Sequence, residues 1–193
     1  MLNAKKMSKV RLTTKVIAYA AACTAAVTAM TLMGFSSAQF YFNLGDAIIL
    51  IVSVIFGPFI GMIAGGLGSF FADLAVYPAT MFYTLVIKGL EGLIAGGLTI
   101  LIKKFVKNKK LSVVLGAASM AIAAYFMMTG YFVCQTFFYG SKESALVALP
   151  MDAVQASVSL VVAFVALYPM KMINFREKVY ISDKAETKQK NED

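Results

Sequence analysis

The chain has 193 residues, of which 60% are hydrophobic and only 15% are charged, and its mean hydropathy is +0.76. A soluble domain of this size carries about 25% charged residues and cannot bury such an excess of apolar side chains in its own core. The composition therefore excludes a soluble enzyme and a disordered protein. We expect a protein that is embedded in a lipid bilayer.

The net charge of +8 comes from 18 basic and 10 acidic residues, and the basic residues fall mainly in three clusters that bracket apolar segments. The clusters are Lys5, Lys6, Lys9, Arg11 and Lys15; Lys103, Lys104, Lys107, Lys109 and Lys110; and Lys171, Arg176, Lys178, Lys184, Lys188 and Lys190. Such clusters are typical of the cytoplasmic loops of membrane proteins. No nucleic-acid-binding motif accompanies them, so we expect no nucleic-acid partner.

Histidine is absent from the sequence, and the two cysteines, Cys23 and Cys134, each lie inside an apolar segment. Metal sites of the zinc type require clustered cysteine and histidine, and a disulfide framework requires more cysteines. We therefore expect no metal, no cofactor and no histidine-based catalysis.

Long apolar segments alternate with short polar ones along the whole chain. We predict helices over residues 12–34, 46–56, 58–77, 81–105, 111–138 and 145–172. Gly57-Pro58 separates the second helix from the third, because proline removes a helical hydrogen-bond donor. Residues 1–11 are expected to be a cytoplasmic segment, 12–172 one membrane domain and 173–193 a charged cytoplasmic tail. The predicted fold is an all-α bundle of six transmembrane helices in a bacterial plasma membrane.

The three basic clusters determine the expected orientation. Six passes place all of them, and both termini, in the cytoplasm, whereas five passes would put one terminal cluster outside. Ser36-Ser37-Ala38 also resembles the cleavage site of a signal peptide, but the preceding apolar segment exceeds the usual length of about 7–15 residues. We therefore predict that the first helix is retained.

Small residues recur at four-residue intervals in three of the predicted helices. They are Gly61 and Gly65 in the third helix, Gly92 and Gly96 in the fourth, and Ala18, Ala22 and Ala26 in the first. In lipid this spacing lets helix backbones approach closely, so the glycines predict tight packing rather than a phosphate-binding loop. The alanines either pack within this bundle or offer a groove to the helices of a partner protein.

Several charged and amide side chains lie within the predicted spans, where a charge costs at least about 2.5 kcal/mol and therefore needs a reason. In the six-helix arrangement they gather in the outer half: Asp46, Asp73, Lys88, Glu91, Gln135, Asp152 and Gln155. Helical spacing places Lys88 and Glu91 on one face, and Asp152 and Gln155 on another. A polar cavity roofed by the aromatic loop 35–45 explains these placements together and suits a small ligand with a ring and several hydrogen-bonding groups.

Structural interpretations of the same residues remain open. Lys88 and Glu91 can form an ion pair that only stabilises the fold. Asp46 and Asp152 can cap helices, because acids favour N-terminal turns. The aromatic residues of the loop can form an interfacial belt.

Four short segments resemble the substrate-binding S components of energy-coupling factor (ECF) vitamin transporters. They are YFNLGDAII at residues 41–49, FGP at 56–58, GGLGS at 65–69 and KGLEG at 88–92. The resemblance covers residues 10–172 and is nearest to the branch of hydroxymethylpyrimidine, pyridoxine and pantothenate carriers, with riboflavin carriers as relatives. It implies that the chain binds a vitamin near the outer face and rotates in the membrane against a transmembrane partner driven by two ATPases.

The resemblance also implies roles for particular residues. Ala18, Ala22 and Ala26 would meet the coupling helices of the transmembrane partner, and the loop 35–45 would be a lid. The side chains expected to hold the vitamin are Asn43, Asp46, Lys88, Glu91, Gln135, Asp152 and Gln155, with Tyr41 and Tyr83 stacking on it. No catalytic residue is expected.

The expected function is therefore import of hydroxymethylpyrimidine or pyridoxine as an S component, with pantothenate or riboflavin as the alternative. A solitary proton-coupled secondary transporter is the alternative class, although such proteins usually show inverted repeats that this sequence lacks. An intramembrane enzyme is disfavoured because neither a metal cluster nor a Gly-x-Ser-x-Gly motif is present.

Overall fold

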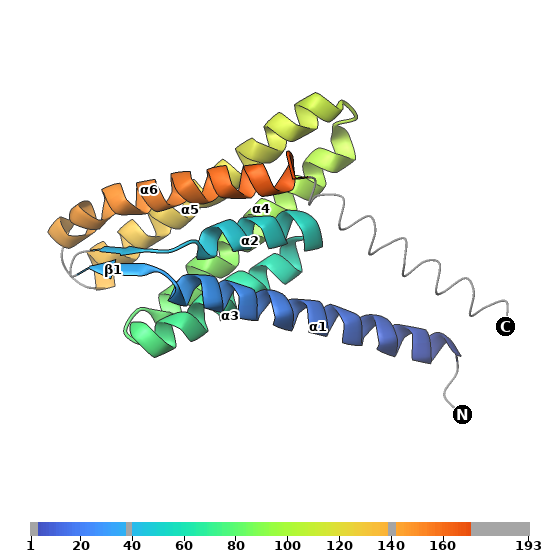
Figure 1. The fold of residues 1–193 in the computed structure, drawn as a ribbon, viewed down its shortest axis with the longest axis horizontal. Helices are drawn as coiled ribbons and strands as arrows, with labels where there is room; N and C mark the ends of the chain where they lie inside the picture. Colours follow the sequence, from blue (N-terminus) through green and yellow to red (C-terminus); the bar gives the residue numbers. More distant parts are fainter. Residues whose placement is uncertain (1–3, 38–39, 139–141, 171–193) are drawn as a thin grey trace.

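A computed structural model describes residues 4–37, 40–138 and 142–170, with side chains described from residue 14 onward except for 35–41. Within these residues there are six helices and one small hairpin (Figure 1). They are α1 (Ala4–Leu32), β1 (Phe35–Ser37), β2 (Phe40–Phe42), α2 (Gly45–Phe56), α3 (Pro58–Val76), α4 (Met81–Phe105), α5 (Lys109–Phe138) and α6 (Lys142–Leu167). The predicted all-α fold with six helices is confirmed. The antiparallel hairpin, in which Ser36 pairs with Tyr41, was not predicted.

Five of the described helices are long and apolar enough to cross a membrane, with α1 contributing its segment Thr14–Leu32. The exception is α2, whose 12 residues give it a length of about 18 Å. A hydrocarbon core is about 30 Å thick, so α2 does not cross it alone. The chain nevertheless runs in one direction along α2 and returns along α3 after Gly57, so α2 counts as one of the six predicted passes.

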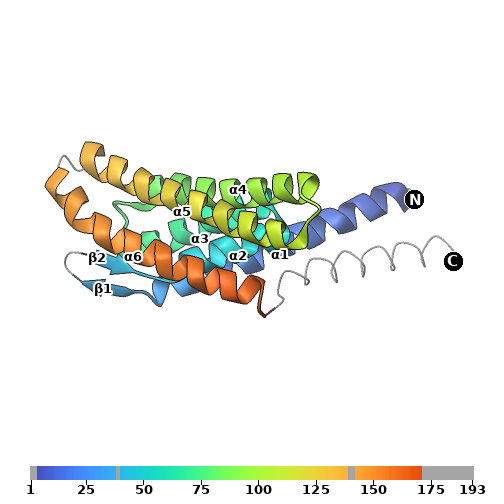
Figure 2. The ribbon, with the colours of Figure 1, turned by 90° about the horizontal axis from the view of Figure 1, so that it is seen from above.

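The connections between the helices fall at two opposite ends of the bundle (Figure 1). The basic end contains the start of α1, residues 106–108 between α4 and α5, and the last turn of α6. The hairpin end contains β1, β2, the α3–α4 connection at residues 77–80 and the start of α6; Figure 2 shows the hairpin beside α6. The mid-chain lysines thus lie at the end where α1 begins, as the predicted orientation requires. The third basic cluster and the tail 173–193 lie outside the described residues.

Two predicted helix boundaries differ from the structure by five residues or more. The first helix begins at Ala4 rather than at residue 12, because the basic segment before the apolar stretch continues the same helix beyond the bundle. The last helix ends at Leu167 rather than at residue 172. Tyr168 precedes Pro169, and a residue before proline is disfavoured in the helical conformation, so the chain leaves the helix there.

Glycines allow α3 and α4 to pack with their backbones in contact. A Cβ atom on Gly65 would lie 2.6 Å from the carbonyl oxygen of Lys88, and one on Gly96 would lie 2.6 Å from the nitrogen of Pro58. A side chain on Gly92 would overlap the carbonyl group of Gly61. The prediction that these glycines serve helix packing is confirmed, and the close contact fixes Lys88 beside α3 and α2.

The helix α2 lies at the centre of the bundle, in contact with α1, α3, α4 and α6. Its side chains are buried on all faces, as expected for a helix that is hydrophobic all round. Leu50, Ile51 and Val54 form the main apolar core with Ala95 of α4 and Ala163 of α6. The only acid of α2, Asp46, lies in its first turn at the hairpin end, above this core.

Candidate functional site

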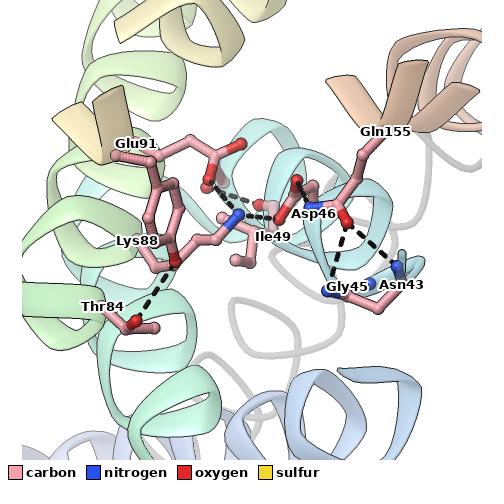
Figure 3. Close-up of polar contacts among 10 residues, drawn as sticks. Asn43, Gly45, Asp46, Ile49, Thr84, Lys88, Glu91 and Gln155 are labelled. Atoms are coloured by element: carbon pink, nitrogen blue, oxygen red, sulfur yellow. Dashed lines mark hydrogen bonds and ion pairs between the residues drawn. The ribbon is translucent and has the colours of Figure 1, made fainter. Parts of the chain in front are cut away.

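A buried ion pair joins α2 to α4 at the hairpin end of the bundle. The ammonium group of Lys88 donates a hydrogen bond to Oδ1 of Asp46, and the two side chains are 5% and 2% exposed (Figure 3). Removing two charges from water costs several kcal/mol for each ion, and only their attraction and further hydrogen bonds offset that cost. The buried charge of Lys88 is therefore stabilised by Asp46, which lies 42 positions earlier in the chain.

Gln155 extends this pair from α6 to the chain segment that follows the hairpin. Its amide nitrogen donates to Oδ2 of Asp46 at 2.8 Å, and its amide oxygen accepts from the backbone N–H of Asn43 at 3.0 Å. The Asn43 side chain in turn accepts from the backbone N–H of Gly45 at 2.8 Å and so orders the start of α2. Figure 3 shows Asp46 between Lys88 and Gln155. We call Asn43, Asp46, Lys88, Glu91 and Gln155 the polar cluster.

Glu91 is the member of the polar cluster with the least satisfied side chain. It is fully buried, and its Oε2 atom lies 3.6 Å from the Lys88 nitrogen, beyond the range of a good hydrogen bond. Within the described part of the chain, neither carboxyl oxygen of Glu91 has a hydrogen-bond partner. The cluster thus contains two carboxyl groups and a single ammonium group.

Aromatic side chains from α4 and α5 border the cluster. The Lys88 nitrogen lies 5.3 Å from the centre of the Tyr131 ring, a distance at which a cation is attracted by the ring. The Tyr131 hydroxyl donates to Oγ1 of Thr84 at 3.3 Å, and Tyr83 meets the Tyr131 ring edge to face at 5.8 Å between centroids. Tyr83 therefore reaches the cluster through Tyr131.

The remaining predicted site residues are less closely connected. Gln135, one turn beyond Tyr131 on α5, is half-buried and makes no hydrogen bond with another described residue. Asp152 is half-buried one turn before Gln155 on α6, and no hydrogen bond or ion pair links it to the described residues. Tyr41 lies in β2, but its side chain falls outside the described part.

The structural interpretations of the acids match the geometry only in part, since Lys88 and Glu91 do form an ion pair. The nearest carboxylate to Lys88 belongs to Asp46 and not to Glu91, so the expected Lys88–Glu91 pair is the weaker contact. Asp46 lies in the first turn of α2, yet its carboxylate binds sideways to α4 and α6, and the N-cap position is Leu44 without a side-chain bond. Asp152 lies in mid-helix, where it caps nothing.

Three polar residues of this region were not among the predicted site residues. Tyr131 and Thr84 are joined by a hydrogen bond beside Lys88, and Ser159 of α6 is fully buried with an unpaired hydroxyl within the described part. Each lies four positions from a predicted site residue on the same helix face: Tyr131 from Gln135, Thr84 from Lys88, and Ser159 from Gln155. Helical spacing from those residues would have found them.

The alanine stripe of α1 lies on the outside of the bundle. Ala18, Ala22 and Ala26 are all exposed, whereas Ala20 and Val27 face inward. On the inner side, α1 packs against α3, where the Thr28 hydroxyl donates to the Gly68 carbonyl at 2.9 Å. The interpretation that the stripe packs within this bundle is therefore wrong.

The polar cluster offers donors and acceptors of both charge signs in an apolar environment, and among the described residues all of its members except Glu91 are hydrogen-bonded to one another. In the described residues no group of three or more His, Cys, Asp or Glu side chains is arranged to hold a metal ion. The cluster is suited to exchange its internal hydrogen bonds for those of a small polar molecule held beneath the hairpin.

The sequence is similar to a known protein family and to a curated protein. The family model of the ECF-type riboflavin transporter, S component, matches residues 11–172. A protein of Pyrococcus woesei described as an "uncharacterized protein in gap 3'region" is 47% identical over 74 residues, which are 37% of this chain and 50% of that protein. The chain thus spans half the length of this curated relative.

Proposed function

Because the chain belongs to the family of S components of ECF-type riboflavin transporters, we propose that it binds riboflavin at the hairpin end and delivers it across the membrane. Hydroxymethylpyrimidine and pyridoxine were the first expectation from the sequence, and riboflavin was an alternative. The family match over residues 11–172 favours that alternative. The chain is accordingly a multi-pass membrane transport subunit.

The observation that carries the proposal is the polar cluster, buried in an otherwise apolar bundle. Riboflavin has a flat tricyclic ring with apolar faces, a polar edge of carbonyl and N–H groups, and a chain of hydroxyl groups. Asp46, Lys88 and Gln155 supply acceptors and donors for such groups, and the Tyr83–Tyr131 pair supplies aromatic surface next to them. A ligand with these features replaces the internal bonds of the cluster without leaving a buried polar group unpaired.

Binding changes the position of the hairpin in this proposal. Asn43 directly follows β2 and is held to α6 by Gln155. A ligand that takes over the hydrogen bonds of Gln155 breaks the contact between Gln155 and Asn43. The hairpin is then free to move and to close over the ligand. No covalent bond forms or breaks, so binding and release need only changes in these hydrogen bonds.

Delivery requires a partner, and the exposed face of α1 is where we place it. Small residues let two helices approach closely in lipid, where dispersion contacts and weak hydrogen bonds replace the hydrophobic effect. Ala18, Ala22 and Ala26 form such a surface and are exposed in the part of the chain that the structure describes. The proposed partner is the transmembrane coupling subunit of an ECF transporter, driven by two ATPase subunits.

Flavin fluorescence tests the substrate. We expect the purified protein in detergent to quench riboflavin fluorescence in a saturable titration with one site per chain. Unlabelled hydroxymethylpyrimidine, pyridoxine and pantothenate should not compete. Displacement of riboflavin by any of these three, at equal or lower concentration, would reassign the substrate.

Substitutions test the site. Asp46→Ala, Glu91→Ala and Gln155→Ala should each weaken riboflavin binding, whereas Ser157→Ala, at an exposed position on α6, should not. Wild-type affinity in all three variants would move the binding site elsewhere. Uptake into proteoliposomes, driven by a pH gradient in the absence of any partner, would instead support the solitary proton-coupled transporter.

A further inference from the structure

The carboxyl group of Glu91 makes no hydrogen bond with the described residues. It is 0% exposed, and both of its oxygens lack a hydrogen-bond partner in the described part of the chain. One oxygen is directed towards Lys88, and the other points away from it (Figure 3). A buried polar group that makes no hydrogen bond destabilises a protein, so its presence requires an explanation. A ligand that binds to the group would supply the missing hydrogen bonds.

We propose that Glu91 is a neutral carboxylic acid that recognises the imide edge of the flavin ring, the N3–H group with its flanking carbonyl. This inference rests on the proposed function. A carboxylic acid offers one acceptor and one donor side by side. The imide edge offers the complementary donor and acceptor, so the two groups form a pair of parallel hydrogen bonds.

The charges around Glu91 favour the neutral form. Lys88 already donates to Asp46, and its contact with Glu91 is a long one at 3.6 Å. An ionised Glu91 would add a second negative charge to a site with one ammonium group, would share that group with Asp46 and would receive no hydrogen bond from the described residues. Burying an ion that shares its counter-charge and receives no hydrogen bond costs more than burying the neutral acid.

Among the described residues, the helices packed on α4 bring no further cation next to Glu91. From α2 comes Asp46, which is itself acidic. From α5 comes Tyr131, whose hydroxyl donates to Thr84, and from α3 comes Asp73, whose carboxylate accepts from Thr80 at 2.6 Å. Lys88 on α4 is therefore the single positive group that faces Glu91 among the described residues.

The position of Glu91 also orients the ligand. It lies one turn from Ala95, which belongs to the main apolar core, whereas Asn43 lies beside the hairpin. An imide bound at Glu91 would place the polar edge of the ring deepest in the bundle and the hydroxyl chain towards Asn43 and the hairpin.

The test is a comparison of riboflavin with 3-methylriboflavin, in which a methyl group replaces the N3 hydrogen. The wild-type protein should bind 3-methylriboflavin about 10- to 100-fold more weakly, because the analogue lacks a donor for a buried acceptor. Glu91→Gln keeps one donor and one acceptor and should retain both riboflavin binding and this discrimination. Glu91→Ala removes the partner and leaves room for the methyl group, so it should lose the discrimination.

Two further measurements separate contact of Glu91 with the ring from contact with the hydroxyl chain and from a loss of folding. Lumiflavin, which has the ring but not the hydroxyl chain, should show the same loss on Glu91→Ala as riboflavin; a loss restricted to riboflavin would place Glu91 on the hydroxyl chain instead. Glu143→Gln, at an exposed acid in the first turn of α6, is the matched control and should bind like wild type. Size-exclusion profiles in detergent establish that each variant is folded.

The outcomes that overturn the proposal are distinct from those that overturn the function. Equal binding of riboflavin and 3-methylriboflavin by the wild type would exclude recognition of N3–H, and undiminished discrimination in Glu91→Ala would assign it to another residue. Loss of riboflavin binding in Glu91→Gln would show that Glu91 acts as a charged group. Absence of riboflavin binding by the wild type would instead overturn the proposed function.

Discussion

The side-chain amide of Gln155 donates to the carboxylate of Asp46 at 2.8 Å and thereby joins α6 to the first turn of α2. The other end of the same amide accepts from the backbone of Asn43, immediately after the hairpin. A single side chain thus connects the central helix, the last helix and the hairpin. Both bonds are buried, so their loss leaves donors and acceptors that water cannot reach.

Replacing Gln155 by leucine should therefore destabilise the protein more than the same change at Gln135. Gln155→Leu removes the bonds to Asp46 and Asn43 and should cost about 1–3 kcal/mol for the buried groups left unpaired. Gln135 is half-buried without a hydrogen bond to another described residue, so Gln135→Leu should change little. Thermal unfolding in detergent, followed by circular dichroism, measures both variants. Equal loss of stability in the two would contradict the role given to Gln155.

The pair of Asp46 and Lys88 predicts unequal effects of its two single substitutions. Lys88→Met leaves two buried carboxyl groups without a cation and should cost about 3–5 kcal/mol. Asp46→Asn should cost less, because Glu91 then ionises and becomes the carboxylate that balances the charge of Lys88. The double variant should be more stable than the sum of the single losses implies. Lys104→Met, at an exposed lysine of the same helix, is the control; an additive double variant would show that the two side chains do not interact.

The long helices could be predicted closely from the sequence, and the hairpin could not. Residues 81–105 were predicted as a helix and form α4, because an apolar stretch in lipid must satisfy its own backbone hydrogen bonds. The two strands have three residues each. Strands so short carry no periodic pattern, and β2 is also held by contacts with α6, which is distant in the sequence.

The residues of the polar cluster could be predicted from the sequence, but the pairing among them could not. Asp46, Lys88, Glu91 and Gln155 were expected to meet because charged and amide groups in lipid need partners, and the resemblance to S components implied that Asn43 joins them. Sequence spacing favoured Lys88 with Glu91, three positions apart. The observed pairing with Asp46 depends on how closely α2 and α3 approach α4, which is set by contacts such as Gly65 against the Lys88 backbone. Contacts of that kind are not encoded in local spacing.

Gly92 and Gly97 lie on the same helix and predict opposite effects of the same substitution. A Cβ atom at Gly92 would overlap the carbonyl group of Gly61, so Gly92→Ala should separate α3 from α4 and cost about 1–3 kcal/mol. A Cβ atom at Gly97 would have no neighbour within 4 Å, so Gly97→Ala should be neutral or stabilise the helix by up to about 1 kcal/mol. Unfolding of the two variants in parallel provides the measurement. A neutral Gly92→Ala would contradict the close packing of α3 on α4.

The exposed alanines of α1 predict a separation between binding and transport. Ala22→Leu, in the middle of the stripe, should abolish association with the coupling subunit and riboflavin uptake in cells while leaving riboflavin binding by the isolated protein unchanged. Ala118→Leu places the same bulk on an exposed position of α5 and should affect neither. Copurification with the coupling subunit, uptake of labelled riboflavin and fluorescence quenching give the three readouts. Normal uptake by Ala22→Leu would exclude this face of α1 as the contact surface.

The two ends of the bundle predict opposite accessibility of two exposed lysines. Lys107 lies between α4 and α5 at the basic end, and Lys142 is the first residue of α6 at the hairpin end. Basic residues are retained in the cytoplasm, so the hairpin end should face outward. In a background with Cys23 and Cys134 replaced by alanine, a membrane-impermeant maleimide added to intact cells should label Lys142→Cys and not Lys107→Cys. Permeabilised cells should show labelling of both. The reverse pattern in intact cells would place the polar cluster on the cytoplasmic side, where a vitamin could not enter it from outside. Labelling of both variants in intact cells would place the two ends of the bundle on the same side of the membrane and would exclude the alternating passes of the chain.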